Sequence, residues 1–283
     1  MITIRHVYPT IRPNGQKPPG LGDYLRGSIA LAWHARRRGY GLHLELSEHP
    51  IGRFLDQALE GQATGGPYLD FSDGDATLVY DWLDQLTPAS PTRMHTNLLP
   101  HASRIDEGVR SMVLDQLRFV PLVAERAGAL HREIADGEFA ALHVRASDAD
   151  FGTHRSPAQP LLHYIQAHIV PAWGRRVAVL SNNTTIKRML CERFSFPYLA
   201  TSAVHLGESQ FDDIGVRDTL VDFTLMGRAA KIYSHSEYGW KSGFSHWCAT
   251  LHGVAFEQID LGLANPASGL RRALRTVLEA CEP

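Results

Sequence analysis

An arginine at the exit of an apolar run is placed to bind a negatively charged ligand. Residues 139–144 read Phe-Ala-Ala-Leu-His-Val, Arg145 follows at once, and Asp148 stands three residues later. A guanidinium keeps its charge and donates two parallel hydrogen bonds to a phosphate. The pattern therefore fits a clamp for a diphosphate. A salt bridge between Arg145 and Asp148 that closes a turn fits the same spacing equally well.

Two further segments have the composition of a phosphate cradle. Pro19-Gly20-Leu21-Gly22-Asp23 precedes a helical run, and its small residues let a ligand approach N–H groups at a helix N-terminus. An ordinary tight turn explains this first segment as well. The second segment, 234–245, leads from a strand into an apolar helix, and its polar and aromatic residues exceed what a turn requires. Its candidate ligands are Ser234, Ser236, Ser242, Gly243, Phe244 and Ser245.

Polar residues also follow the apolar run 177–180. Ser181 and Asn182 could line a ligand, but Asn183 or Thr184 after them can cap a helix, and capping explains the segment on its own. Two Asp-x-Asp triplets, 73–75 and 148–150, have the form that can hold a divalent cation on a diphosphate. We expect the first as a turn before a strand. The second is the rival to a metal-free site.

The length, net charge and composition of the chain limit the class of protein to which it can belong. The chain has 283 residues and a net charge of −2, which favours two domains and excludes a global basic field for nucleic acid. Cys191, Cys248 and Cys281 form no CxxC pair, so we expect reduced, buried thiols. No apolar run approaches membrane-spanning length, and the N-terminus lacks the features of a signal peptide. We expect a cytoplasmic protein without a transmembrane segment; peripheral membrane association stays open.

Helices and strands must position these candidate residues. Short β-branched runs alternate with longer amphipathic runs along the chain, and this alternation predicts an α/β fold with parallel sheets. In the first half we expect strands at 2–7, 42–46 and 75–80 and helices at 23–38 and 105–135, the last divided by Pro121. In the second half we expect strands at 139–144, 177–180, 230–233 and 254–259, and helices at 161–170, 186–194, 218–228, 242–251 and 270–280. Asp136-Gly137 separates a domain of residues 1–136 from one of residues 137–283. A cleft between the carboxyl ends of the two sets of strands would gather the candidate residues.

Three segments in this order resemble the fucosyltransferase superfamily, in particular the rhizobial nodulation α-1,6-fucosyltransferases. Gly20-Leu21-Gly22-Asp23 before a long helix is similar to their Gly-x-Gly-Asp element. The segment from His143 to Asp148 is similar to the His-x-Arg-x-x-Asp motif of α-1,6- and α-1,2-fucosyltransferases, and the stretch from Asp222 to Ser245 is similar to their last motif. The chain departs from the pattern at Ala146, where these families often carry a second arginine, and in a lengthened serine loop.

The resemblance implies a GT-B-like fold, in which two Rossmann-type domains face a central cleft. The N-terminal domain would lie on the acceptor side, and the C-terminal domain would bind the nucleotide sugar. The implied reaction transfers fucose from GDP-fucose to a hydroxyl of a glycan or glycoconjugate, with inversion and without a metal or other cofactor. Arg145 would hold the β-phosphate, with His143 and Asp148 shaping its loop. Asp222 would read guanine, and the candidate phosphate-binding serines are Ser236, Ser242 and Ser245.

The implied chemistry is a direct displacement of GDP by the acceptor hydroxyl. Arg145 and a helix N-terminus supply fixed donors for the charge that develops on the leaving phosphate. Asp23 is the candidate base for the hydroxyl, and a helix cap explains Asp23 equally well. Two alternatives remain: a metal-dependent transferase that uses another nucleotide sugar through Asp148 and Asp150, and a non-catalytic nucleotide-sugar-binding module.

Overall fold

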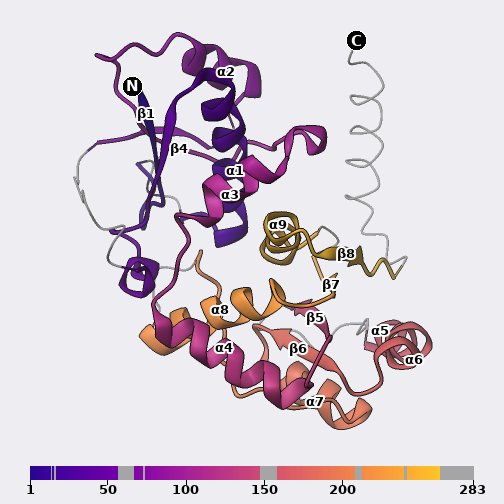
Figure 1. Ribbon diagram of the computed structural model, residues 1–283. Coiled ribbons are helices and arrows are strands. Elements are labelled where there is room, and N and C mark those ends of the chain that lie inside the picture. Colours follow the sequence, from indigo (N-terminus) through magenta and orange to yellow (C-terminus); the bar gives the residue numbers. More distant parts are fainter. Residues whose placement is uncertain are drawn as a thin grey trace.

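The chain folds into a mixed α/β structure with two parallel sheets (Figure 1). The computed structural model describes residues 1–13, 15, 17–56, 67–72, 74–146, 158–207, 212–238 and 241–261. Each sheet has four strands, in the order β2-β1-β4-β3 in the first and β6-β5-β7-β8 in the second. The α/β fold with parallel sheets that the sequence predicts is therefore confirmed.

The first sheet and its helices come from the N-terminal half. The strands are β1 (Thr3–Val7), β2 (Gly41–Glu45), β3 (Leu69–Phe71) and β4 (Arg93–Thr96). The helices are α1 (Leu21–Arg38), the 3-10 helices η1 (Pro50–Phe54) and η3 (Ala102–Arg104), α2 (Ala76–Asp84) and α3 (Glu107–Leu114). Helix α1 ends at Gly39, whose φ of 67° is left-handed, as the predicted glycine stop requires.

The second sheet and its helices follow. The strands are β5 (Ala140–Arg145), β6 (Val177–Ser181), β7 (Lys231–Ser236) and β8 (Ala255–Gln258). The helices are α4 (Pro121–Ile134), α5 (Ala158–Tyr164), the π-helix η4 (Ile165–Ile169), α6 (Val170–Trp173), α7 (Thr184–Phe194), α8 (Asp213–Met226) and α9 (Gly243–His252). Proline begins α4, as predicted. The predicted closing helix at 270–280 lies outside the described residues.

The strand expected at 75–80 is wrong, because this segment begins helix α2. The side chain of Asp75 accepts a hydrogen bond from the backbone N–H of Thr77 (2.7 Å) and caps the helix. Val79 and Leu83 then lie four residues apart on its buried face. Strands β3 and β4 were not predicted, since both are short and β4 is largely polar. Asp73, Asp150 and Cys281 lie outside the described residues.

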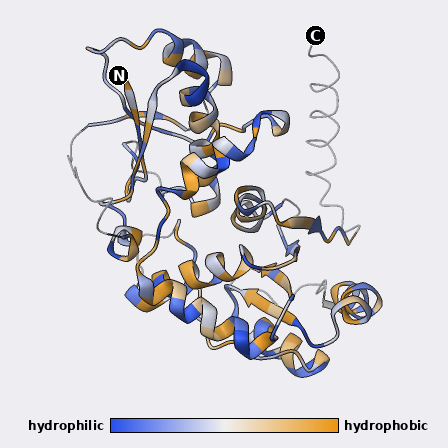
Figure 2. Cartoon of the chain, in the orientation of Figure 1, coloured by the Kyte–Doolittle hydropathy of each residue, from blue (hydrophilic) through white to orange (hydrophobic). Residues whose placement is uncertain are grey.

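One hydrophobic cluster runs through both halves of the chain and includes residues from Ile4 to Leu251. Helix α9 follows β7 in sequence, yet it packs against α1 and α3 of the N-terminal half. Helix α4 packs along α8. Figure 1 shows α9 between the upper and lower groups of elements, and Figure 2 shows hydrophobic residues concentrated on α8 and β6. Helix α9 therefore joins the two sheets, because it follows β7 and packs on the N-terminal half.

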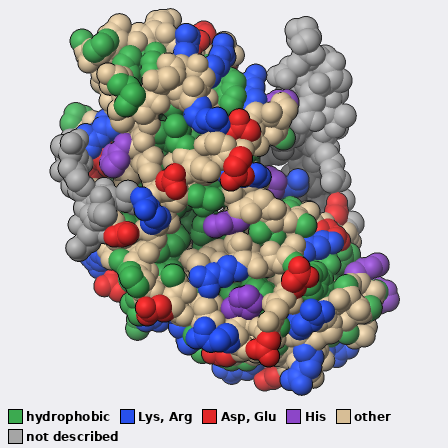
Figure 3. All heavy atoms as spheres, viewed as in Figure 1, with side chains coloured by type: hydrophobic (Ala, Val, Ile, Leu, Met, Phe, Trp, Pro, Cys, Tyr) green, Lys and Arg blue, Asp and Glu red, His purple; other side chains and the backbone are tan. Residues whose placement is uncertain are grey.

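The surface and the cysteines agree with the composition. Figure 3 shows Lys and Arg side chains interspersed with Asp and Glu over the viewed face, in keeping with a net charge of −2. Cys191 and Cys248 are free and buried, as predicted. Among the described residues, no helix is both long and apolar enough to cross a membrane.

Candidate functional site

The carboxyl ends of β5 and β7 form the first candidate site. Strand β6, which follows β5 in sequence, lies on one side of β5, and β7 lies on its other side. In the pairing of β5 with β7, Arg145 lies opposite Ser236. In open α/β sheets, ligands bind in the crevice at such a reversal. Arg145 is the last residue of β5, so its half-buried side chain stands at the carboxyl end of the strand, which is the place of such a crevice.

Arg145 has an aromatic neighbour and no acidic partner in the described part of the chain. Its guanidinium carbon lies 5.7 Å from the ring centroid of Tyr238, and its carbonyl accepts a hydrogen bond from the N–H of Glu237 (3.1 Å). Among the residues that the structure describes, no carboxylate forms an ion pair with it. Asp148, the partner in the salt-bridge alternative, lies outside the described residues. The described surroundings leave the charge of Arg145 available to an anion.

His143 lies two residues before Arg145 on the same face of β5. Its ring centroid is 5.6 Å from that of Phe244, in the first turn of α9. Burial, with a contribution from the charge of Arg145, lowers the pKa of His143 to about 3. The imidazole is therefore neutral near pH 7. Within the described chain, its Nδ1 has no hydrogen-bond partner.

The predicted serines gather where β7 leads to α9. The hydroxyls of Ser234 and Ser245 lie 2.8 Å apart, and both side chains are buried, so they join β7 to the helix start. The hydroxyl of Ser236 accepts a hydrogen bond from the N–H of Tyr238 (3.4 Å). Ser242 is the N-cap residue of α9 without a side-chain capping bond. We therefore assign the hydroxyls of Ser236 and Ser242 as the candidates for ligand binding. The hydroxyls of Ser234 and Ser245 instead hold β7 and the start of α9 together.

Ser181 and Asn182 hold the backbone beside Arg145. The Ser181 hydroxyl donates to the carbonyl of Val144 (2.7 Å). The Asn182 amide accepts from the N–H of Ala146 (3.1 Å) and donates to its carbonyl (2.8 Å). Both residues thus contact the predicted site through the backbone. Asn183 caps α7, as the capping alternative predicts.

The glycine element of the first half touches the start of α9. Gly20 is the N-cap residue of α1, and a glycine has no side chain that could cap the helix. A Cβ atom on Gly22 would lie 2.4 Å from the carbonyl carbon of Gly243 and 2.5 Å from the nitrogen of Phe244. The two helix starts therefore meet backbone to backbone, and only glycine fits at position 22. Their N–H groups without intrahelical partners are gathered in one region.

Gly20 and Asp23 also line a cavity of about 390 Å³ at the carboxyl ends of the first sheet. Asp23 lies in the first turn of α1 and is not its cap. Its Oδ1 is 3.4 Å from Nη2 of Arg26, and its side chain is 51% exposed, so it remains accessible to a ligand.

Asp222, on α8, belongs to a buried polar cluster. Its carboxylate accepts a hydrogen bond from the hydroxyl of Thr201 (2.9 Å) and is 1% exposed. Lys187 Nζ, also buried, donates to the Thr201 hydroxyl (2.6 Å) and carbonyl (3.1 Å). Burial raises the pKa of Asp222 to about 6, and the charge of Lys187 opposes this rise. Sequence reasoning missed Lys187, whose only signal is its helical spacing with the buried Leu190 and Cys191.

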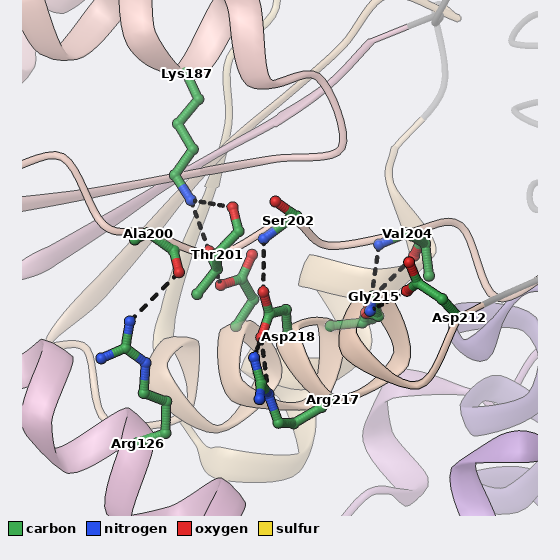
Figure 4. Close-up of polar contacts among 12 residues, drawn as sticks. Arg126, Lys187, Ala200, Thr201, Ser202, Val204, Asp212, Gly215, Arg217 and Asp218 are labelled. Carbon is green, nitrogen blue, oxygen red and sulfur yellow. Dashed lines mark hydrogen bonds and ion pairs between the residues drawn. The ribbon is translucent and has the colours of Figure 1, made fainter.

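The same face of α8 holds an extended segment in place (Figure 4). Asp218 accepts from the N–H of Ser202 (2.9 Å), and the Thr219 hydroxyl accepts from the N–H of Val204 (2.9 Å). The chain continues to His205, whose Nε2 lies 3.1 Å from the position that a Cβ on Gly20 would take. The polar face of α8 thus positions a segment of the second half against the glycine element of the first.

Comparison with solved structures identifies the fold of the chain. No family model matches the chain, and no curated protein matches it. Solved structures do: NodZ α-1,6-fucosyltransferase soaked with GDP-fucose is 17% identical, with a TM-score of 0.51 over 93% of this chain and 96% of that chain. NodZ co-crystallised with GDP is 16% identical, with a TM-score of 0.54 over 92% and 94%. NodZ from Bradyrhizobium is 16% identical, with a TM-score of 0.53 over 93% and 96%, and POFUT1 in complex with GDP is 12% identical, with a TM-score of 0.50 over 90% and 98%.

The chain has the fold of these fucosyltransferases. The resemblance that the sequence motifs indicate is confirmed at this level. Within the fold, the structure brings together Arg145, His143, the serine segment and Gly22, which are far apart in sequence. Asp222 bonds the hydroxyl of Thr201 in a buried cluster, and Asp148 lies outside the described residues.

Proposed function

We propose that the chain is an inverting, metal-independent glycosyltransferase that transfers fucose from GDP-fucose to a hydroxyl of a glycan or glycoconjugate. The observation that carries the proposal is Arg145 at the carboxyl end of β5, opposite Ser236 of β7 and two residues after His143, whose ring lies 5.6 Å from that of Phe244 at the start of α9. Solved structures of the same fold include NodZ soaked with GDP-fucose and POFUT1 in complex with GDP. A diphosphate is the part of such a donor that an arginine and exposed backbone N–H groups bind best.

The proposal includes a GT-B-like arrangement. Residues 1–136 would form the acceptor-side domain and residues 137–283 the nucleotide-sugar-binding domain, with a cleft between them. It is supported by one parallel sheet on each side of this boundary and by the contact of Gly22 with Gly243.

In the proposed reaction, the acceptor oxygen forms a bond with the anomeric carbon of fucose while the bond to the β-phosphate oxygen breaks. GDP leaves with the electron pair of that bond. Arg145 and the N–H groups at the start of α9 stabilise this charge with donors that are already oriented. Asp23 takes the proton of the acceptor hydroxyl. Ser236 and Ser242 donate to the phosphates, with Gly243 and Phe244 supplying backbone N–H groups.

The remaining candidates have supporting roles in this proposal. Neutral His143 and the backbone contacts of Ser181 and Asn182 hold the end of β5. The guanine-reading role that the resemblance implies for Asp222 requires its carboxylate to leave the Thr201 hydroxyl, because the side chain is 1% exposed.

The test is the replacement of Arg145. Losing one fixed donor to a developing charge costs about 10²–10³ in rate, so we expect Arg145→Ala to lose transfer or donor hydrolysis on that scale. Arg145→Lys should recover little, because an ammonium lacks the guanidinium fork. Arg132→Ala is the control, because Arg132 is an exposed residue in the last turn of α4. Near-normal turnover in Arg145→Ala would contradict the proposal.

Two further measurements separate the alternatives. Loss of activity with EDTA, restored by a divalent cation, would support a metal site at Asp148 and Asp150 instead. Calorimetric binding of GDP without transfer or hydrolysis of GDP-fucose would identify a binding module.

A further inference from the structure

Residues 201–207 run from the polar face of α8 to the first half of the chain, and we name them the 201–207 segment. Helix α8 holds the beginning of this segment through side chains (Figure 4). Three hydrogen bonds of 2.9 Å do so: Asp222 with the hydroxyl of Thr201, Asp218 with the N–H of Ser202, and Thr219 with the N–H of Val204. The segment therefore follows α8 closely before it leaves the helix.

Thr219 has the most local of these roles. Its buried hydroxyl accepts the N–H of Val204, and its one proton lies within reach of the carbonyls of Gly215 (2.8 Å) and Val204 (3.1 Å). Thr224, on the same helix, donates to the carbonyl of Leu220 (2.8 Å), which is an ordinary bond within a helix. Thr219 thus differs from a typical helical threonine by its bond to the segment.

The far end of the 201–207 segment lies against the glycine element of the first half. A Cβ atom on Gly207 would lie 3.2 Å from the nitrogen of Gly20, 3.2 Å from the carbonyl oxygen of Pro18 and 2.7 Å from Cε1 of His205. A Cβ atom on Gly20 would in turn lie 3.1 Å from Nε2 of His205. The segment is therefore in close contact with the residues that begin α1.

A second contact reaches the same helix through stacked rings. Nδ1 of His49 accepts from the N–H of Ile51 (3.2 Å), so the ring proton is on Nε2, which donates to the carbonyl of Leu206 (3.4 Å). The ring of His49 stacks on Tyr8 with 4.0 Å between centroids, and Tyr8 stacks on Tyr24 at 4.5 Å. Tyr24 lies in the first turn of α1. Two contacts of the segment therefore converge on this turn.

The start of α1 thus contacts the second half at two places, the 201–207 segment at Gly20 and the start of α9 at Gly22. The same turn carries Asp23, the proposed base, whereas Arg145 belongs to the second half. The distance between base and donor depends on these two contacts. A misplacement of about 1 Å between reacting groups can cost about a hundredfold in rate.

We propose that the 201–207 segment positions Asp23 against the donor-binding half, and that Thr219 is a positioning residue for the transfer step. This inference rests on the proposed transferase function and adds to it a residue outside the motifs that the sequence indicates. The alternative is that Thr219 only stabilises the second half. The close contacts at the far end of the segment, made with the first half, favour positioning.

The first test is Thr219→Val, which keeps the shape of the side chain and removes the acceptor of the Val204 N–H. Thr219→Ser keeps the hydroxyl and is the rescue variant. Thr224→Val is the matched control, because it removes a hydroxyl of the same helix that bonds only within the helix in the described chain. Three quantities are measured on the full-length protein: hydrogen exchange of residues 18–24 by mass spectrometry, the Kd of GDP by calorimetry, and the rate of GDP-fucose hydrolysis at saturating donor.

We expect Thr219→Val to raise the exchange rate of residues 18–24 at least about threefold, because the contact that orders them is loosened. The rate of hydrolysis should fall at least about tenfold, while the Kd of GDP stays within about twofold, because the change displaces the base and not the donor. Thr219→Ser and Thr224→Val should behave as wild type.

Gly207→Ala tests the other end of the segment without touching α8. Its methyl group would press on the backbone of Gly20 and Pro18, so we expect the same three results as for Thr219→Val. Gly137→Ala is its control, because a Cβ atom there has no neighbour within 4 Å in the described chain. This variant decides the question where Thr219→Val fails to fold.

Unchanged exchange of residues 18–24 in the folded variants would overturn the inference, as would an unchanged rate of hydrolysis or a loss of rate that saturating donor restores. Failure of the proposed function has a different signature. The wild-type protein would then neither bind GDP nor hydrolyse GDP-fucose, and Arg145→Ala would change nothing, while the exchange rates would still show whether the segment positions residues 18–24.

Discussion

Adding a single methyl group at Gly22 should separate the two halves of the site. A Cβ atom there would lie 2.4 Å from the carbonyl carbon of Gly243, whereas ordinary contacts begin at 3.4 Å. The starts of α1 and α9 must therefore move apart by about 1 Å in Gly22→Ala. Overpacking costs about 1–3 kcal/mol, and the better helix propensity of alanine offsets up to about 1 kcal/mol of it.

We therefore expect Gly22→Ala to lower the free energy of unfolding by about 1–2 kcal/mol, measured by urea denaturation. The larger effect should be on transfer, because a displacement of about 1 Å between reacting groups can cost about a hundredfold in rate. Gly128→Ala adds the same methyl group to α4, where the nearest atom is Nη1 of Arg228 at 3.4 Å. This control should keep full activity with equal or higher stability. Wild-type turnover in a folded Gly22→Ala protein would refute the reasoning.

Three other substitutions test the supports of the site. Lys187→Met should lower the free energy of unfolding by about 3–5 kcal/mol, because it leaves the Asp222 carboxylate buried without its cation. A loss of less than about 1 kcal/mol, measured by urea denaturation, would contradict this. Burial lowers the pKa of His49 to about 4, so the unfolded chain binds a proton that the folded chain does not, and stability falls as the pH drops from 6.5 to about 4. His49→Asn should reduce this slope by up to about 1.4 kcal/mol per pH unit in denaturation curves across that range, and an unchanged slope would argue against a neutral buried ring. Asn182→Asp removes the donor to the carbonyl of Ala146. We expect a lower rate of transfer with little change in the midpoint of thermal unfolding, because the backbone after Arg145 shifts while the core stays intact. A lower midpoint with an unchanged rate would contradict this.

The sequence predicts elements whose patterns are strong locally. Strands β5 and β6 are apolar runs, and α1 has helical spacing and a glycine stop, so all three were predicted nearly to their bounds. Helix α2 was mistaken for a strand because its first residues are apolar and β-branched, and only the capping bond of Asp75 fixes it as a helix. Strand β4 reads Arg-Met-His-Thr and is stabilised by its place between β1 and β3, which no local pattern reveals.

The candidate site residues also divide into those with a local sequence signal and those without one. Arg145 has a local signal, because it is a charged residue directly after an apolar strand, although a salt bridge with Asp148 fits the same spacing. The roles of the serines were not, because a hydroxyl that bonds a phosphate and one that bonds another serine, as in Ser234 and Ser245, look alike in a sequence. The contact of Lys187 with Thr201 depends on tertiary proximity alone.

The position of α9 has a consequence for how the chain is made. Helix α1 is translated before its partner α9, which follows roughly 200 residues later, a delay of roughly 10–40 seconds at about 5–20 residues per second. During that time the apolar surface of α1 that α9 covers stays exposed on the nascent chain. The N-terminal half can therefore complete its core only after α9 has been synthesised, and a chaperone that binds apolar helices has that interval in which to act.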